Sequence, residues 1–123
     1  MFASHRFGLP SAFAFVVGVF LVIEGLWGLF SPVVFGALTT SILHSVMHFV
    51  LGLAGIATGM QSRPSGFLIF LGVLLLTVGV MRFMPDTSAF VVRTLAVNQP
   101  VAMVHIVVGG VALALGLAAR QRY

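Results

Sequence analysis

Residues 41–60 read SILHSVMHFVLGLAGIATGM, an apolar run that carries two histidines and three glycines. A helix rises 1.5 Å per residue, so about 20 residues span the roughly 30 Å hydrocarbon core of a bilayer. Apolar stretches of similar length occupy residues 11–30, 66–84 and 100–119, and helix-breaking prolines lie between them. These four stretches predict an all-α, polytopic membrane protein whose four transmembrane helices form a bundle of two similar hairpins.

The composition agrees with a protein that is dissolved in lipid. Of the 123 residues, 60% are hydrophobic and 7% are charged, whereas a soluble domain has about 25% charged residues. The four stretches use most of the chain, so residues 1–123 are expected to form a single transmembrane domain. The first stretch is longer than the apolar core of a typical signal peptide, and we expect it to remain as a spanning helix.

Several function classes have little support in this sequence. The chain has no cysteine, which excludes disulfides and thiolate metal sites, and its two acidic residues provide little for hydrolysis or phosphoryl transfer. We therefore expect a protein that is not an enzyme. All six basic residues are arginines that lie near predicted helix ends, where they set topology, so nucleic-acid binding is not expected in spite of a pI near 11.7.

The arginines also predict an orientation in the membrane. Four lie on the side of the two termini, and two lie on the other side beside an acid: Arg6, Arg63, Arg120 and Arg122 against Arg82 and Arg93 with Asp86. Cytoplasmic segments carry an excess of basic residues. We expect a multi-pass protein of the cell membrane with both termini in the cytoplasm.

The two halves of the chain resemble each other. A shift of 57 residues places HFVLG (48–52) on HIVVG (105–109), and a shift of 54 residues aligns glycines in 11–30 with glycines in 66–84. Two spans return a chain to its starting side, so the two copies would share one orientation about an axis along the membrane normal. The pattern predicts a duplicated two-helix unit.

Glycine stripes predict where the helices pack closely. Small residues at helical spacing lie on one face and allow two backbones to approach each other. His44 and His48 share such a face, so we expect both histidines to point inward. The glycines expected to pack the helices are Gly18, Gly25, Gly52, Gly55, Gly59, Gly72, Gly79, Gly109 and Gly116.

Four ionisable side chains are expected to form a buried polar cluster in the membrane half away from the termini: Glu24, His44, His48 and His105. Counted from the helix ends, they lie about 6–12 Å below that surface. Charged groups in hydrocarbon are costly unless they are paired or neutral. The cluster is therefore a candidate functional site.

Several interpretations of this cluster stay open. The histidines can hydrogen-bond across helix interfaces as a structural clamp, they can relay protons, or His44, His48 and His105 can ligate a metal ion. Histidines at matched depth on facing helices, such as His48 and His105, also suit the two axial ligands of a haem. Glu24 can act as a proton carrier, as a metal ligand or as a neutral acid bonded to a neighbour.

Three further features lie near the cluster. The methionines of this membrane half suit either Cu(I) binding or the filling of gaps between helices: Met47, Met81, Met84 and Met103. Arg82 and Asp86 are four residues apart, and we expect an interfacial pair or a snorkelling arginine. Residues 86–97 begin with helix-capping types and are expected to form either a short interfacial helix over the cluster or a plain loop.

LHSVMHFVLGLAG (43–55), together with NQPVAMVHIVVGGVALALG (98–116), resembles a family of small bacterial four-helix membrane proteins catalogued as a domain of unknown function. The resemblance covers most of the chain. It implies that these residues belong to the family's pattern: His44, His48, Gly52, Gly55, Asn98, His105 and Gly109. Ser45 stands where an asparagine is usual, and Glu24 has no counterpart. The resemblance supports the fold and the membrane location, and it leaves the activity open.

The sequence therefore favours an integral membrane protein with a structural or accessory role, which packs in the bilayer with itself or with a larger complex. No cofactor is needed for that role. The alternative is a membrane redox protein that binds haem or a metal through its inward-facing histidines.

Overall fold

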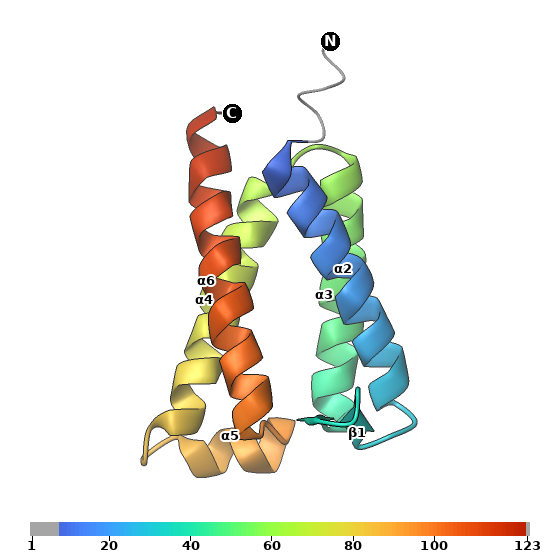
Figure 1. The fold of residues 1–123 in the computed structure, drawn as a ribbon, viewed down its shortest axis with the longest axis vertical. Coiled ribbons are helices and arrows are strands. Elements are labelled where there is room, and N and C mark those ends of the chain that lie inside the picture. The colour runs from blue at the N-terminus through green and yellow to red at the C-terminus, as the bar shows by residue number, and fades with distance from the viewer. Residues whose placement is uncertain (1–7, 123) are drawn as a thin grey trace.

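The computed structural model describes the backbone of residues 8–122. Its elements are α2 (Leu9–Gly28), β1 (Val33–Val34), β2 (Leu38–Thr39), α3 (Ile42–Met60), α4 (Ser65–Phe83), α5 (Ser88–Leu95) and α6 (Gln99–Arg122) (Figure 1). Within the described residues, α2, α3, α4 and α6 are long and apolar enough to cross a membrane. Their ends lie within three residues of the predicted stretches, which confirms the all-α fold with four candidate transmembrane helices.

The long helices form two antiparallel hairpins that lie side by side (Figure 1). α2 packs along α3, and α4 packs along α6, while contacts between the two hairpins are fewer. The first residues of α2 and the last residues of α6 lie at the same end of the molecule. The predicted duplication of the two hairpins stays a prediction.

The two links at the opposite end differ from each other. β1 and β2 form a small antiparallel hairpin in which Val34 pairs with Leu38. Its turn contains Phe35 and Gly36 with φ of 55° and 73°, left-handed values that a tight reversal of this kind requires. The other link contains α5, so the helical alternative for residues 86–97 is the one that forms.

Side-chain caps set where the two histidine-bearing helices begin. The Ser41 hydroxyl accepts a hydrogen bond from the His44 backbone N–H at 3.2 Å, at the start of α3. The Asn98 side-chain oxygen accepts one from the Val101 N–H at 3.0 Å, at the start of α6. These caps fix the depth of the histidines below this end of the molecule.

Glycines bring the backbones of each hairpin into contact. A methyl group added at Gly52 would lie 2.6 Å from the backbone oxygen of Gly18, and one added at Gly72 would lie 2.8 Å from that of Gly109. A Cβ atom is not accommodated at such distances without movement of the backbone. A methyl group added at any of five other glycines would also lie within 3.0 Å of a backbone atom of a neighbouring helix: Gly25, Gly55, Gly59, Gly79 and Gly116.

Two apolar clusters hold the helices together, and the first of them joins the hairpins. The first lies between α2, α4 and α6 and consists of Ala14, Val17, Leu21, Phe67, Leu68, Leu71, Leu75 and Ala112. The second packs α5 onto α6 and consists of Val91, Leu95, Val97, Val101 and Ala102. The first cluster holds the two hairpins together, and the second holds α5 against α6.

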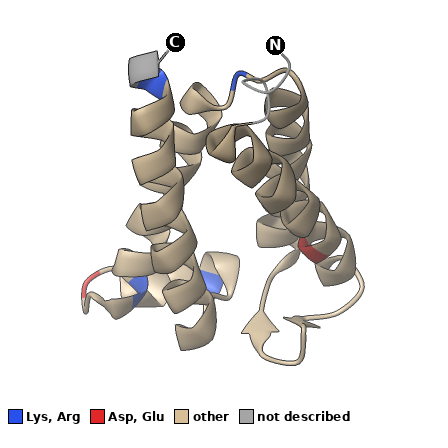
Figure 2. Ribbon diagram, turned by 45° about the horizontal axis from the view of Figure 1, so that its top comes forward, with Lys and Arg blue, Asp and Glu red and all other residues tan. Residues whose placement is uncertain are grey.

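Among the described residues, charged residues lie near helix ends, in the links and in α5, apart from Glu24 within α2 (Figure 2). Arg82, at the end of α4, donates hydrogen bonds to the Val97 carbonyl at 2.9 Å and to the Ser88 hydroxyl at 3.3 Å. Its guanidinium therefore ties α4 to the α5 link, and no ion pair joins it to Asp86 in the described part of the chain. Arg6, one of the arginines behind the predicted orientation, lies outside the described residues.

Candidate metal centre

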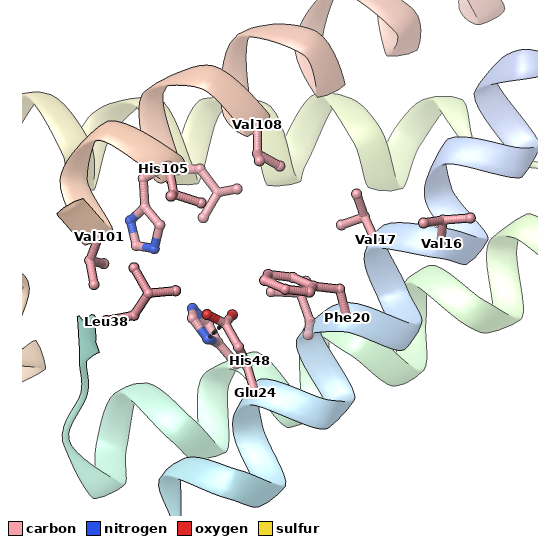
Figure 3. Close-up of a pocket in the computed structure, with 12 residues that line it drawn as sticks. Val16, Val17, Phe20, Glu24, Leu38, His48, Val101, His105 and Val108 are labelled. Atoms are coloured by element: carbon pink, nitrogen blue, oxygen red, sulfur yellow. Dashed lines mark ion pairs between the residues drawn. The ribbon is translucent and has the colours of Figure 1, made fainter. Parts of the chain in front are cut away.

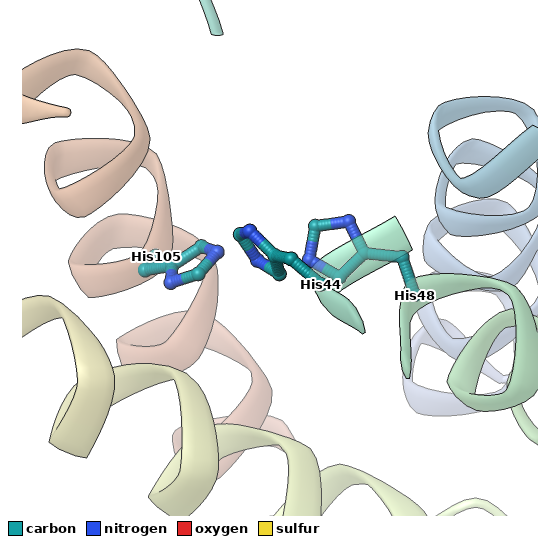
Figure 4. Close-up of side chains that lie close together, drawn as sticks. All are labelled: His44, His48 and His105. Atoms are coloured by element: carbon teal, nitrogen blue, oxygen red, sulfur yellow. The ribbon is translucent and has the colours of Figure 1, made fainter. Parts of the chain in front are cut away.

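Three imidazole rings meet between the two hairpins (Figure 4). The ring centroid of His44 lies 4.1 Å from that of His48 and 5.4 Å from that of His105. The centroids of His48 and His105 are 5.9 Å apart. Each ring offers a nitrogen, and these nitrogens all lie within 4.8 Å of one another. The three side chains are buried, with exposed fractions of 3%, 6% and 5%.

Helix geometry explains why the rings converge. His44 and His48 are four residues apart, so they occupy one face of α3, and His105 approaches them from α6. Gly79 of α4 lies next to His105, because a methyl group at Gly79 would be 3.3 Å from the His105 Cβ. The absence of a side chain at this glycine lets α4 support the helix that carries His105.

Two of the rings are oriented by hydrogen-bond acceptors on neighbouring elements. Nδ1 of His48 lies 3.1 Å from a carboxylate oxygen of Glu24 on α2 (Figure 3). Nδ1 of His44 lies 2.9 Å from the backbone oxygen of Leu95 at the end of α5. When Nδ1 carries the proton and donates a hydrogen bond, Nε2 keeps a free lone pair. Metal-binding histidines are commonly oriented in this way.

Three of the remaining ring nitrogens have no protein partner in the part of the chain that the structure describes. Nε2 of His48 and both nitrogens of His105 are buried and unbonded within residues 8–120. A buried polar atom left without a partner costs about 1–3 kcal/mol. The centre therefore presents lone pairs that a bound ion would satisfy.

The spacing suits a single metal ion. Zinc binds histidine nitrogens at about 2.0–2.1 Å in a tetrahedron, which puts ligand nitrogens about 3.3 Å apart. The observed separations, none of which exceeds 4.8 Å, are of comparable size. Imidazole ligands suit Zn, Cu, Fe and Ni.

A haem does not suit this arrangement. The axial ligands of a haem lie on opposite faces of a flat macrocycle. Here the centroid of the His44 ring lies 4.1 Å from that of His48 and 5.4 Å from that of His105, while the centroids of His48 and His105 are 5.9 Å apart, so the rings form a compact triangle and His44 occupies space beside the other two that a macrocycle would need (Figure 4). The geometry favours an ion, which His44 can also bind, over a porphyrin.

A cavity of about 240 Å³ adjoins the centre (Figure 3). Glu24, His48 and His105 form its polar end. The rest of its wall is apolar and comes from several elements, with Phe20 on α2, Leu38 on β2, Leu75 on α4, and Val104 and Val108 on α6. An apolar cavity therefore lies directly beside the polar side chains of the centre.

Of the two alternatives for the methionines, the filling of gaps between helices fits two of them. Met47 and Met81 pack against the apolar cluster beneath α5. Met84 and Met103 are 47% and 60% exposed.

One part of the centre lacks an obvious signal in the sequence, and the burial of Glu24 has a signal besides its charge. The Leu95 carbonyl is a backbone acceptor, which residue type does not reveal. Glu24 lies off the stripe of Gly18 and Gly25, yet it is 8% exposed. The spacing of Val17, Leu21 and Glu24 at i, i+4 and i+7 marks a second buried row on α2, and that row faces the cavity.

Comparison with known proteins identifies the family and leaves the activity open. The family described as Domain of unknown function (DUF4383) matches residues 11–118, a range that includes both hairpins and all four residues of the polar cluster. No curated protein and no solved structure matches the chain. The resemblance carried by residues 43–55 and 98–116 is confirmed, and the chain belongs to the Domain of unknown function (DUF4383) family.

Proposed function

We propose that this membrane protein binds a divalent transition-metal ion, such as Zn²⁺, through His44, His48 and His105. One observation carries the proposal: three buried imidazoles place nitrogens within 4.8 Å of one another, and Nε2 of His48 and both nitrogens of His105 have no partner among the described residues. Three histidines with an open fourth position are a common zinc ligand set in proteins.

The surroundings support an ion of positive charge. Three neutral imidazoles leave the charge of a divalent ion uncompensated, which is costly in a low-dielectric interior. The Glu24 carboxyl group lies directly behind His48, 3.1 Å from its Nδ1, on the side of the ring away from the proposed ion. Its role is to orient and polarise the His48 ring, while the three histidines are the ligands.

A cobalt titration tests the proposal. The purified protein in detergent, stripped with a chelator, is titrated with Co²⁺, whose visible absorption reports tetrahedral nitrogen ligation, and Zn²⁺ is then added as a competitor. We expect saturable binding of one ion per chain that His48→Ala and His105→Ala abolish. His5→Ala, outside the described residues, is the matched control and is expected to bind as the parent does. An unchanged cobalt spectrum in His105→Ala would overturn the proposal.

A second candidate is the structural or accessory role that the sequence favours, in which the protein packs with itself or with a larger membrane complex. The contacts of Glu24 with His48, and of His44 with Leu95, support it because they tie α2 to α3 and α3 to the end of α5. This role accounts for two of the three rings. It gives no partner to His105, which is why the metal proposal ranks first.

We infer that both ends of the chain face the cytoplasm in the cell membrane. Arg63 and Arg120 lie at the end where α2 begins and α6 ends, and the metal centre lies toward the opposite end, beside α5. The proposed ion site would then belong to the outer half of the bilayer.

A further inference from the structure

The cavity beside the metal centre opens toward lipid between α2 and α6. Val16 on its rim is 62% exposed. Val16 lies seven residues from the first residue of α2, or about 10 Å along that helix. Val108 lies about 14 Å from the first residue of α6, measured from the opposite end of the molecule. These depths place the mouth within the hydrocarbon core, so a ligand would enter from the membrane and not from water.

The size and walls of the cavity describe the ligand. An apolar cavity of about 150 Å³ is known to hold benzene, and this cavity of about 240 Å³ accommodates one such ring with small substituents. Its walls are apolar up to the end formed by Glu24, His48 and His105. A suitable ligand is therefore a single ring with a polar atom at one end.

Phe20 gives the cavity a rigid aromatic wall. Its ring stacks on that of Phe35 in the turn of the β-hairpin, with centroids 5.4 Å apart and an angle of 7° between the planes. The other side of Phe20 faces the cavity (Figure 3). Offset stacking on a fixed ring favours a flat aromatic or quinone-like ligand over a flexible chain.

We propose that this cavity binds a membrane-soluble single-ring compound with an oxygen substituent, of the phenol or quinone type, whose oxygen completes the coordination of the metal. The proposal rests on the proposed function, because His48 and His105 line the cavity and are also two of the three expected ligands. A metal held by three histidines keeps a fourth position for an outside ligand.

Fluorine NMR with a pair of matched probes tests this proposal. Para-fluorophenol carries the oxygen, and para-fluorotoluene has the same ring with a methyl group in its place. Each is added to the cobalt-loaded protein in lipid nanodiscs, with the zinc-loaded protein as the diamagnetic reference. We expect para-fluorophenol to bind about tenfold more tightly than para-fluorotoluene, and its signal to show a paramagnetic shift that only the cobalt form produces.

Two valine variants locate the binding site. Val104 lines the cavity, so Val104→Phe fills it, whereas Val107 is 63% exposed toward lipid on the same helix. We expect Val104→Phe to weaken para-fluorophenol binding by at least about tenfold while cobalt binding is retained. Val107→Phe is expected to leave both unchanged.

The outcomes separate this proposal from the metal proposal. If Co²⁺ binds through the three histidines and para-fluorophenol shows no paramagnetic shift, the ligand proposal fails and the metal site stands. Equal effects of Val104→Phe and Val107→Phe also overturn the ligand proposal, because the probe would then lie in the lipid. If Co²⁺ does not bind, the proposed function fails, and the coordination of a ring oxygen fails with it.

Discussion

The Glu24 carboxylate lies 3.1 Å from Nδ1 of His48, and both side chains are buried on facing helices. This contact joins α2 to α3 inside the region of the protein that crosses lipid. A carboxylate behind an imidazole fixes which ring nitrogen carries the proton and makes the other a stronger ligand. The contact therefore links the packing of the first hairpin to the proposed metal centre.

Replacing the carboxylate should weaken metal binding without removing a ligand. Mutation of the group behind a metal-bound histidine commonly costs 10–100-fold in affinity, and we expect a loss of that order for Zn²⁺ in Glu24→Gln, in which a neutral amide replaces the carboxylate. Calorimetric titration measures it. Asp86→Asn removes the other acidic group, which lies outside the long helices, and should leave the affinity unchanged. Equal affinities in Glu24→Gln and the parent would show that the carboxylate does not act through His48.

Two histidine variants should move the stability of the metal-free protein in opposite directions. His105 makes no hydrogen bond within the described residues, so His105→Leu removes buried unbonded atoms and should raise the free energy of unfolding by up to about 3 kcal/mol. His44→Leu removes the bond to the Leu95 carbonyl and should lower it by about 1–3 kcal/mol. Thermal unfolding in detergent after chelation measures both.

The same pair of variants discriminates between the two candidate functions. A structural clamp requires His105 to contribute to stability through its own contacts. A lower melting temperature for metal-free His105→Leu would favour the clamp over the metal centre.

Close packing at glycine should make one alanine substitution costly and another harmless. A methyl group at Gly52 would lie 2.6 Å from the Gly18 oxygen, whereas no atom lies within 4 Å of one at Gly110. Gly52→Ala should therefore lower stability by about 1–3 kcal/mol through displacement of α2 from α3. Gly110→Ala should be neutral or stabilising by up to about 1 kcal/mol, because alanine favours the helix. Chemical unfolding in detergent compares the two, and equal stabilities would contradict the close approach of α2 and α3.

Single cysteines test the orientation, because the parent chain has none. Gln61→Cys places a thiol in the link between α3 and α4, and Asp86→Cys places one in the link between α4 and α5. A membrane-impermeant thiol reagent applied to intact cells should label Asp86→Cys alone. Labelling of Gln61→Cys alone would reverse the orientation and move the proposed metal centre to the cytoplasmic half.

Much of this protein can be predicted from the sequence because lipid imposes simple rules. Apolar runs of spanning length predict the four long helices, since backbone groups in hydrocarbon must be hydrogen-bonded within a helix. The spacing of His44 and His48 places both on one face of α3 in any helix, whatever surrounds them. These conclusions need only local geometry and the length of each run.

Other features depend on how distant segments approach one another. Sequence spacing cannot show that the rings of His44, His48 and His105 form a compact triangle, which disfavours haem, because this depends on how α6 packs against α3. Nor can it show that the Leu95 carbonyl holds His44, or that Arg82 binds Val97 and not Asp86. The sequence determined the helices and the faces of their side chains; the tertiary structure alone decided which faces meet, because distances between helices are set by packing across segments far apart in the chain.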